Sequence, residues 1–181
     1  TATGTKTTGT STPGDWATNS NNYGSLQTAL NQGWTANDQI ILDDGTWSIV
    51  SNQTGVSGAA NGSTLNLKSR SLDPALCIID YSSATATGFS FNHASNAYTI
   101  NIEGITFKKT TTQTSLTACT LFGFLQLTGN VTFTNCIIGP ATLTDASTTA
   151  RENSHFQINA HAGRTITFNG CTIDGLTSTL V

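Results

Sequence analysis

The fold is decided by three related segments in the second half of the chain: TINIEGITF (residues 99–107), NVTFTNCII (residues 130–138) and TITFNGCTI (residues 165–173). Each segment alternates apolar and polar residues, bends at Gly104, Asn135 or Gly170, and then alternates again. Equivalent positions recur after 31 and then 35 residues. A period of this length is typical of repeat proteins, in which each unit buries its apolar side against the next. The segments therefore predict a repeat architecture.

The alternation also predicts which residues face the inside of each repeat. A first inward file precedes the bend and contains Leu65, Leu67, Ile100, Ile102, Val131, Phe133, Ile166 and Phe168. A second file follows the bend and contains Cys77, Ile79, Ile105, Phe107, Cys136, Ile138, Cys171 and Ile173. A third file lies before each motif and contains Phe89, Phe91, Leu125, Leu127, Phe156 and Ile158. Three strands per repeat, with like residues in register, predict an all-β coil of parallel sheets, that is, a parallel β-helix.

The bends favour this interpretation. Gly and Asn adopt the left-handed backbone conformation that such a corner needs at the lowest cost. An antiparallel sandwich is the competing fold, but it needs hairpin turns, and these corners are too open for two-residue hairpins. We expect loops of uneven length, over residues 108–118 and 139–154, to project from the coil.

The first part of the chain divides into an arm and the beginning of the coil. Residues 1–22 are rich in Thr, Gly, Ser and Asn and have no apolar period, which predicts an N-terminal arm ahead of one β-helix domain over residues 23–181. Ser25 suits a helix N-cap and Gly33 a helix end, which predicts a short helix of about two turns between them. Further along, we expect strands at residues 40–42 and 47–49 around a turn at residues 43–45, and a loop over residues 51–63.

The stretch LQTAL (residues 26–30), followed by DQIILDDGTW (residues 38–47), resembles the helical cap and first repeat of right-handed parallel β-helix proteins of the pectin-lyase-like superfamily. LKSRS (residues 67–71), CIID (residues 77–80) and the three repeat segments continue the similarity, which covers about residues 23–175. The resemblance implies a right-handed coil that begins with a short capping helix. It carries no single activity, because the superfamily includes lyases, hydrolases, adhesins and non-enzymatic domains.

Composition limits the classes of function. Charged residues make up 9% of the chain, compared with about 25% in typical soluble domains. A net charge of −3 with seven Lys and Arg residues offers no basic surface for phosphates, so we expect no nucleic acid partner. No apolar run approaches the about 20 residues of a membrane span, so we expect no membrane insertion.

The low charge and three N-x-S/T sequons suit a secreted or cell-surface protein. Asn52, Asn61 and Asn130 are the candidate glycosylation sites. The chain begins at Thr1 and contains no Met, so we expect it to have been processed or cut from a longer chain.

The resemblance raises the question of a lyase site. Such enzymes remove a proton beside a uronate with a basic residue, while Ca²⁺ or Arg neutralises the carboxylate. The weak catalytic candidates are Lys108, Arg151, His155 and Arg164, and the last three are expected to approach one another near the final repeats. No acidic pair recurs on adjacent repeats, so a calcium site of the lyase kind is not visible. We therefore favour solvated loop residues over catalytic ones, and expect no cofactor.

Two further groups are candidates for chemistry. Asp38, Asp43 and Asp44 form the densest acidic group and are weak candidates for binding a hard cation, but Asp-Asp-Gly also suits a simple turn, which we favour. Cys136 and Cys171 occupy equivalent inward positions, which places their Cα atoms about 5 Å apart and within disulfide range. Buried free thiols are an equal alternative, since Cys packs as a small hydrophobe.

Three classes of function stay open. The favoured one is a non-enzymatic extracellular structural or adhesive protein that assembles head to tail with other copies of itself, because a parallel coil that stops after Ile173 leaves backbone groups and apolar residues uncovered. Further domains of a longer chain are the other expected partner. The second class is a polysaccharide lyase, glycoside hydrolase or glycan-binding module. The third is an ice-binding protein, suggested by the outward files that join Thr132 to Thr167 and Thr106 to Thr172, although each file is interrupted.

Overall fold

The structure is a computed structural model of the whole chain, and it describes residues 39–48, 53–54, 62–81, 89–92, 99–113, 120–127, 129–145, 154–160 and 163–180. These residues form strands, bends and turns and contain no helix. The arm predicted over residues 1–22 and the helix predicted after Ser25 lie outside them.

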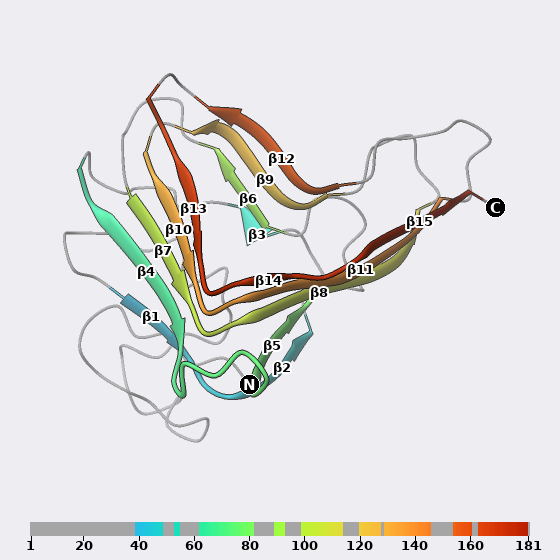
Figure 1. Cartoon of the computed structure of the whole chain (residues 1–181), viewed down its shortest axis with the longest axis horizontal. Coiled ribbons are helices and arrows are strands. Elements are labelled where there is room, and N and C mark those ends of the chain that lie inside the picture. The colour runs from blue at the N-terminus through green and yellow to red at the C-terminus, as the bar shows by residue number, and fades with distance from the viewer. Residues whose placement is uncertain are drawn as a thin grey trace.

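The strands assemble into three sheets, and each sheet collects every third strand (Figure 1). Sheet A contains β1 (Gln39–Leu42), β4 (Thr64–Ser69), β7 (Thr99–Glu103), β10 (Val131–Thr134) and β13 (Ile166–Asn169). Sheet B contains β2 (Gly45–Ser48), β5 (Cys77–Asp80), β8 (Thr106–Gln113), β11 (Ile137–Asp145) and β14 (Thr172–Ile173), and β15 (Leu176–Leu180) also pairs with β11. Sheet C contains β3 (Gln53–Thr54), β6 (Phe89–Asn92), β9 (Thr120–Leu127) and β12 (Ser154–Ala160).

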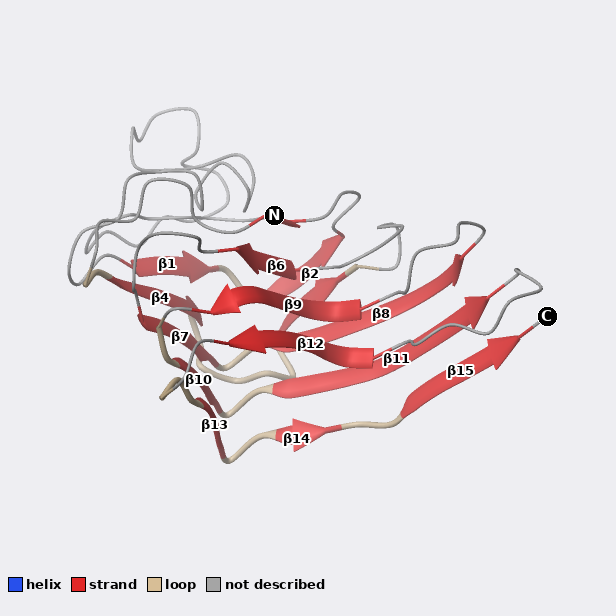
Figure 2. Ribbon diagram, turned by 90° about the horizontal axis from the view of Figure 1, so that it is seen from above, coloured by secondary structure: helices blue, strands red, loops and turns tan. Residues whose placement is uncertain are grey.

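Every strand pair in these sheets is parallel. Parallel neighbours need a crossover between them, and here the crossover from one strand of a sheet to the next runs through the other two sheets (Figure 2). The described part of the chain is thus all-β with parallel strands, an arrangement compatible with a parallel β-helix. The antiparallel sandwich is excluded for these residues.

The core of the described residues contains the first two predicted inward files up to Ile138, together with Ile40, Leu42, Trp47 and Tyr81. Along β4 and β7 buried and half-buried residues alternate, as expected for strands with one face inside. Phe107 pairs with Ile79 on one side and with Ile138 on the other, and all three have no exposed surface. Ile173 pairs with Ile138 in the next repeat. The predicted stacking of like residues from successive repeats is therefore confirmed.

The three predicted corners are confirmed as well. Gly104, Asn135 and Gly170 have φ angles of 67°, 48° and 61°, in the left-handed region. Backbone bonds join neighbouring corners, since the Gly104 amide donates to Thr134 O at 3.1 Å and the Asn135 amide donates to Asn169 O at 2.8 Å. The corners of successive repeats therefore stack on one another where the chain turns from sheet A into sheet B.

A loop over residues 70–76, which joins β4 to β5, packs across these corners. Its amide at Arg70 donates to Leu42 O at 2.8 Å, which ties it to the preceding repeat. On the other side, Asn135 Nδ2 donates to Leu72 O at 2.8 Å. The loop also lies so close to Gly104 that a Cβ there would be 2.5 Å from Leu72 Cα. We call this segment the 70–76 loop; it connects repeats that are not neighbours in the sheets.

Three loop predictions are wrong in part. β8 runs to Gln113 and β11 runs to Asp145, through segments predicted to be loops, and β3 interrupts the predicted loop over residues 51–63. The residues after Ile173 also form a strand, β15, along the far half of β11. These segments lack apolar alternation but are rich in Thr, a β-branched residue that suits strands, and their backbone groups pair with neighbouring strands.

The predicted register of the third inward file is wrong. Phe89 and Phe91 of β6 pair with Phe122 and Phe124 of β9, rather than with Leu125 and Leu127. Phe156 of β12 likewise pairs with Phe122. The stretch TLFGFLQL is apolar almost throughout, so alternation alone leaves its register open.

Candidate functional site

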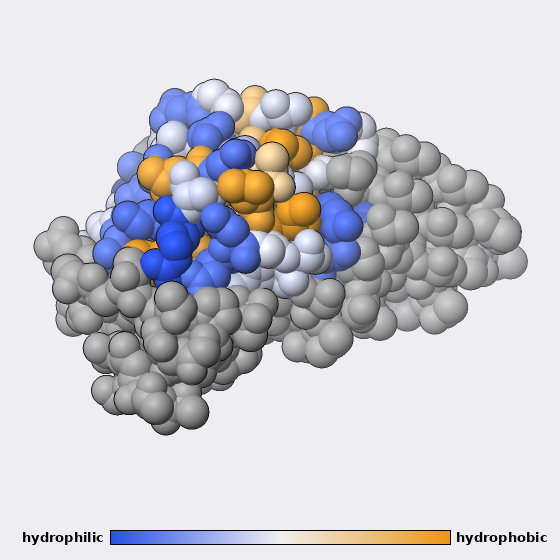
Figure 3. All heavy atoms as spheres, turned by 90° about the horizontal axis from the view of Figure 1, so that it is seen from below, coloured by the Kyte–Doolittle hydropathy of each residue, from blue (hydrophilic) through white to orange (hydrophobic). Residues whose placement is uncertain are grey.

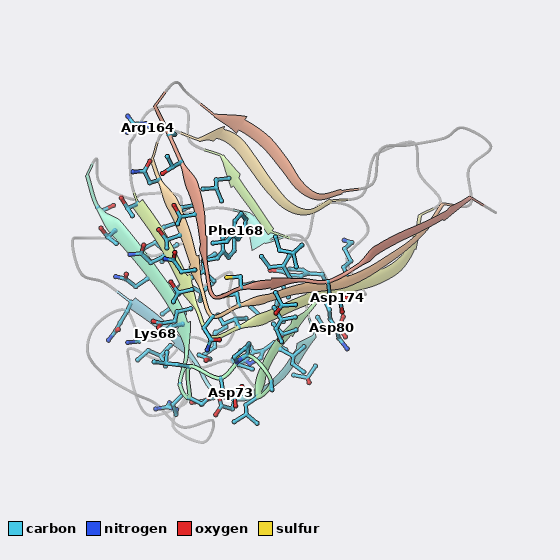
Figure 4. The ribbon with its side chains drawn as sticks, in the orientation of Figure 1. Lys68, Asp73, Asp80, Arg164, Phe168 and Asp174 are labelled. Carbon is cyan, nitrogen blue, oxygen red and sulfur yellow. The ribbon has the colours of Figure 1, made fainter. Side chains whose placement is uncertain are left out.

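The last repeat leaves its inner face partly uncovered. Phe168 of β13 is 39% exposed and Ile173 of β14 is 52% exposed, whereas their partners Phe133 and Ile138 have no exposed surface. Cys171, between them in the chain, is half-buried. In Figure 4 the side chain of Phe168 points from β13 into the interior of the coil. We call this set, Phe168, Cys171 and Ile173, the end face.

The end face also lies beside unpaired strand edges. β13 and β14 are the outermost strands of sheets A and B in the described part of the chain, so each has a neighbour on one side there. Edge strands present free N–H and C=O groups at the spacing of a parallel ladder. One repeat earlier, the corresponding edge of β10 pairs with β13, and the ring of Phe168 stacks on that of Phe133. The end face can therefore bind a further strand that carries an apolar residue at alternate positions.

Two of the four catalytic candidates, Lys108 and Arg164, have described side chains, and the structure keeps them apart. Lys108 Nζ forms an ion pair with Asp80 Oδ2 at 3.1 Å on the outer face of sheet B. Arg164 is exposed, before β13, and in Figure 4 it lies at a different corner of the cross-section from Asp80. His155 belongs to β12, and Arg151 lies outside the described residues. Lys108 and Arg164 therefore do not share a site.

Asp43 and Asp44 act as acceptors for the 70–76 loop. Asp43 is 4% exposed, and its Oδ1 forms an ion pair with Arg70 and accepts a hydrogen bond from Arg70 Nε. Oδ1 of Asp44 accepts a hydrogen bond from Ser71 Oγ at 2.8 Å. Both carboxylates thus anchor the turn to the next repeat, and Asp38 lies outside the described residues. No group of three or more His, Cys, Asp or Glu side chains that could hold a metal ion occurs in the described ranges.

Cys77 at the start of β5 and Cys136 just before β11 are buried, and Cys171 just before β14 is half-buried; none of the three is in a disulfide in the structure. Cys136 donates its backbone N–H to Cys171 Sγ at 3.5 Å, so the two residues predicted as a disulfide lie next to each other. Burial raises the pKa of the Cys77 thiol from 9.0 to about 12, with the nearby Asp44 and Asp43 adding to the shift. Burial also raises the pKa of Cys136 to about 12. Both thiols are therefore protonated and unreactive at neutral pH, while the Cys136–Cys171 bond stays a prediction.

The outer face of sheet A is polar and largely uncharged. Asn66, Asn101, Thr132 and Thr167 form one file across β4, β7, β10 and β13. Within the file Asn101 Nδ2 donates to Asn66 Oδ1 at 2.9 Å. The predicted alignment of Thr132 with Thr167 is confirmed, and so is its interruption by Asn101. The second Thr file, from Thr106 to Thr172, is likewise interrupted by Ile137.

Of the three sequons, the structure describes the one at Asn130. This residue is exposed, and its Oδ1 accepts a hydrogen bond from the Thr165 amide at 3.1 Å. Nδ2, the atom to which a glycan is attached, is not part of that bond. Asn52 and Asn61 lie outside the described residues. Glycosylation at all three stays a prediction.

Sequence reasoning missed two features of the molecule. Lys109, expected to be a solvated loop residue, is fully buried, because β8 continues and places it on the inner face two residues after Phe107. Tyr81 is also fully buried, and burial raises the pKa of its hydroxyl well above 10.0. Lys109 lies two residues after Phe107, so a strand that continued through both would place them on the same face. The prediction of a loop from residue 108 prevented this inference.

The 70–76 loop adds two exposed apolar side chains to the outer surface. Leu72 is 39% exposed and Leu76 is 52% exposed. Figure 3 shows apolar residues among hydrophilic ones on the side of the molecule that carries this loop. Leu72 has a φ of 59°, which is rare for a residue other than Gly, Asn or Asp. The loop is therefore held in its conformation by its contacts with the corners.

Comparisons of the chain with protein-family models, with curated proteins and with solved structures found no match. Over its described residues the chain belongs to the all-β class with parallel strands. No helix in the described ranges is both long and apolar enough to cross a membrane.

Proposed function

We propose that the chain is a right-handed parallel β-helix of the pectin-lyase-like kind, with three strands per repeat and a short capping helix at its start. The grouping of every third strand into one sheet supports three strands per repeat. The near-equivalent corners at Gly104, Asn135 and Gly170 support a regular coil. The capping helix rests on the resemblance of residues 26–47 and on the helix signals at Ser25 and Gly33.

We further propose that this β-helix is a non-enzymatic extracellular structural or adhesive protein that assembles through its end face. This proposal rests on the exposure of Phe168 and Ile173, since the residues at the equivalent positions of the preceding repeat, Phe133 and Ile138, are fully buried. An apolar face beside open strand edges binds an added strand, since pairing satisfies the edge and buries the side chains.

The proposed occupant is residues 1–22 of a second copy. The first described strand, β1, does not expose apolar side chains as the end face does, because its Ile40 and Leu42 are fully buried. The arm is rich in Thr, which favours strands, and carries few charges. A contact between the arm of one molecule and the end face of the next is heterologous, so it repeats without closing and produces a fibre.

The carbohydrate-active alternative receives less support. Lys108 is paired with Asp80, and it lies away from Arg164, so these two candidates supply no common base and carboxylate clamp. A glycan-binding role would rest instead on the polar file of sheet A, where amide and hydroxyl groups are aligned. An assay for unsaturated products on pectate, alginate or chondroitin distinguishes a lyase from a structural or glycan-binding protein. We expect this assay to be negative.

The test of assembly compares the full chain with an end-face variant. We expect concentration-dependent association by sedimentation velocity, and fibres by electron microscopy. Ile173→Asp should abolish both, because a charge replaces the apolar contact. Thr167→Asp is the matched control, since Thr167 is exposed on the outer face of the same repeat and should leave assembly intact.

Deletion of residues 1–22 should also abolish association. Thermal melting of each variant verifies that the fold survives. A wild-type chain that stays monomeric at all concentrations, or a folded Ile173→Asp variant that assembles as the wild type does, would overturn the proposal.

A further inference from the structure

The corner that follows β13 begins with an Asn-Gly dipeptide, Asn169–Gly170. The two preceding corners read Glu103–Gly104 and Thr134–Asn135, so of these three corners the last one alone places an Asn directly before a Gly. Asn-Gly is a reactive pair, because the backbone nitrogen of the Gly can attack the side-chain carbonyl carbon of the Asn and close a five-membered ring. Gly hinders this approach least, since it has no side chain.

Both residues of this corner are open to solvent. Asn169 and Gly170 are exposed, whereas Gly104 at the first of the three corners is buried. A Cβ added to Gly104 would lie 2.5 Å from Leu72 Cα, but one added to Gly170 would meet nothing within 4 Å. The last corner therefore leaves room for water and for movement of the peptide group, which the first corner does not.

The last corner is also held by fewer hydrogen bonds than the corner before it. The peptide group between Thr134 and Asn135 is bonded at both ends, since its oxygen accepts from the Gly104 amide at 3.1 Å and its N–H donates to Asn169 O at 2.8 Å. In the peptide group between Asn169 and Gly170 the oxygen is bonded in this way, but the N–H has no backbone acceptor among the residues that the structure describes. Ring closure turns this peptide group, so it breaks one such bond rather than two, and local opening is easier there.

We propose that Asn169–Gly170 is a site of spontaneous deamidation. The Gly170 nitrogen loses its proton and bonds to Asn169 Cγ, while the bond from Cγ to the side-chain nitrogen breaks and ammonia leaves. Water then opens the resulting five-membered imide. Attack of water at Cγ produces aspartate, and attack at the backbone carbonyl carbon produces isoaspartate, in which the main chain runs through Cγ. Water is the only reactant that the conversion requires.

Either product changes the last repeat. Aspartate adds a negative charge at the end of β13, where Asn169 pairs with the uncharged Thr134. Isoaspartate lengthens the main chain by one carbon at the corner. The pairing of β14 with β11 begins directly after this corner, where the Thr172 amide donates to Cys136 O at 2.9 Å. The extra carbon therefore shifts the segment that carries Ile173 of the end face.

The test follows the folded full chain during incubation at neutral and mildly alkaline pH. Peptide mapping by mass spectrometry detects the mass difference between an acid and an amide at Asn169, and distinguishes this site from the other Asn-Gly pair, Asn61–Gly62. We expect faster conversion at the higher pH, because the Gly170 nitrogen must lose its proton. Asn169→Gln should lose most of the conversion, since a Gln side chain would have to close a six-membered ring.

Glu103→Asn is the matched variant, because it places the same dipeptide at a corner inside the coil. There the Gly104 amide donates to Thr134 O, and Leu72 packs closely against the corner. In the folded variant, conversion at position 103 should be several-fold slower than conversion at Asn169 of the same molecule. In urea, where the chain is unfolded, the two positions should convert at similar rates.

The inference does not rest on assembly through the end face, because the reaction takes place within one molecule. Ile173→Asp, which targets assembly, should therefore also be converted at Asn169, and circular dichroism verifies that each variant is folded. The proposal is overturned if Asn169 keeps its amide in both the folded wild-type chain and folded Ile173→Asp. It is also overturned if the two positions of folded Glu103→Asn convert at the same rate.

Discussion

The aromatic rings of Phe133 and Phe168 lie stacked in adjacent repeats, with centroids 5.2 Å apart and planes inclined by 10°. The two side chains are chemically identical and differ in exposure, since Phe133 is fully buried and Phe168 is 39% exposed. Phe133→Ala leaves a cavity between two repeats and should lower the free energy of unfolding by about 3–5 kcal/mol. Phe168→Ala should lower it less, because water fills the space. Urea denaturation followed by circular dichroism measures both, and equal losses would contradict the open end face.

Gly104 and Gly170 form a second matched pair. Both have a left-handed φ, so an Ala substitution costs about 1–2 kcal/mol of backbone energy at either position. At Gly104 the added Cβ would also meet Leu72 Cα at 2.5 Å, whereas at Gly170 it meets nothing within 4 Å. Gly104→Ala should therefore have the lower urea midpoint of the two. Similar midpoints would mean that the 70–76 loop does not pack on this corner.

Stability should fall at alkaline pH because of the buried thiols. The folded chain holds the protons of Cys77 and Cys136 up to about pH 12, whereas the unfolded chain releases them near pH 9. The unfolded state thus binds fewer protons above pH 9, so the contribution of these thiols to the free energy of unfolding is constant below that pH and decreases between pH 9 and 12. The slope is up to about 1.4 kcal/mol per pH unit for each thiol.

Other groups titrate in the same range, so the contribution of the thiols needs a comparison. The double variant Cys77→Ala, Cys136→Ala should show a shallower decrease of melting temperature between pH 9 and 11 than the wild type. Parallel decreases in the two proteins would show that the thiols are not buried in the folded state.

The Arg70–Asp43 and Lys108–Asp80 ion pairs should differ in their effect on stability. Arg70→Met leaves the carboxylate of Asp43, which is 4% exposed, without its cation, and should cost about 1–3 kcal/mol. Lys108→Met breaks the more exposed pair with Asp80 and should cost less than about 1 kcal/mol. Thermal melting at low and high salt compares them. A larger loss for Lys108→Met would contradict the anchoring role of Arg70.

Alternation and periodicity were sufficient to predict the parallel sheets and the first two inward files. Strands with one buried face, such as β4 and β7, have a clear period of two, and the corners are marked by Gly or Asn. The third file lacked this signal, because an apolar run such as TLFGFLQL satisfies several registers. Its register depends on pairing with β6 and β12, which are distant in sequence.

The residues of the end face were predicted as inward, but the full length of β8 and β11 was less predictable, for a physical reason. Thr-rich segments were expected to be loops because they lack apolar residues, yet Thr110 and Thr142 belong to paired strands. Backbone pairing with a neighbour in register decides their structure, and a pattern read one segment at a time does not contain it. The ion pair of Arg70 with Asp43 likewise joins residues of different repeats.

The bond between Asn135 Nδ2 and Leu72 O joins residues that are 63 positions apart in sequence, and so spans more than one repeat of the coil. Coils whose units contact only their immediate neighbours tend to unravel from one end, unit by unit. Here the 70–76 loop acts as a brace across several units, so loosening one of them strains the others. Under mechanical pulling, the middle of the coil should consequently give way in a single force peak, rather than in a series of small steps.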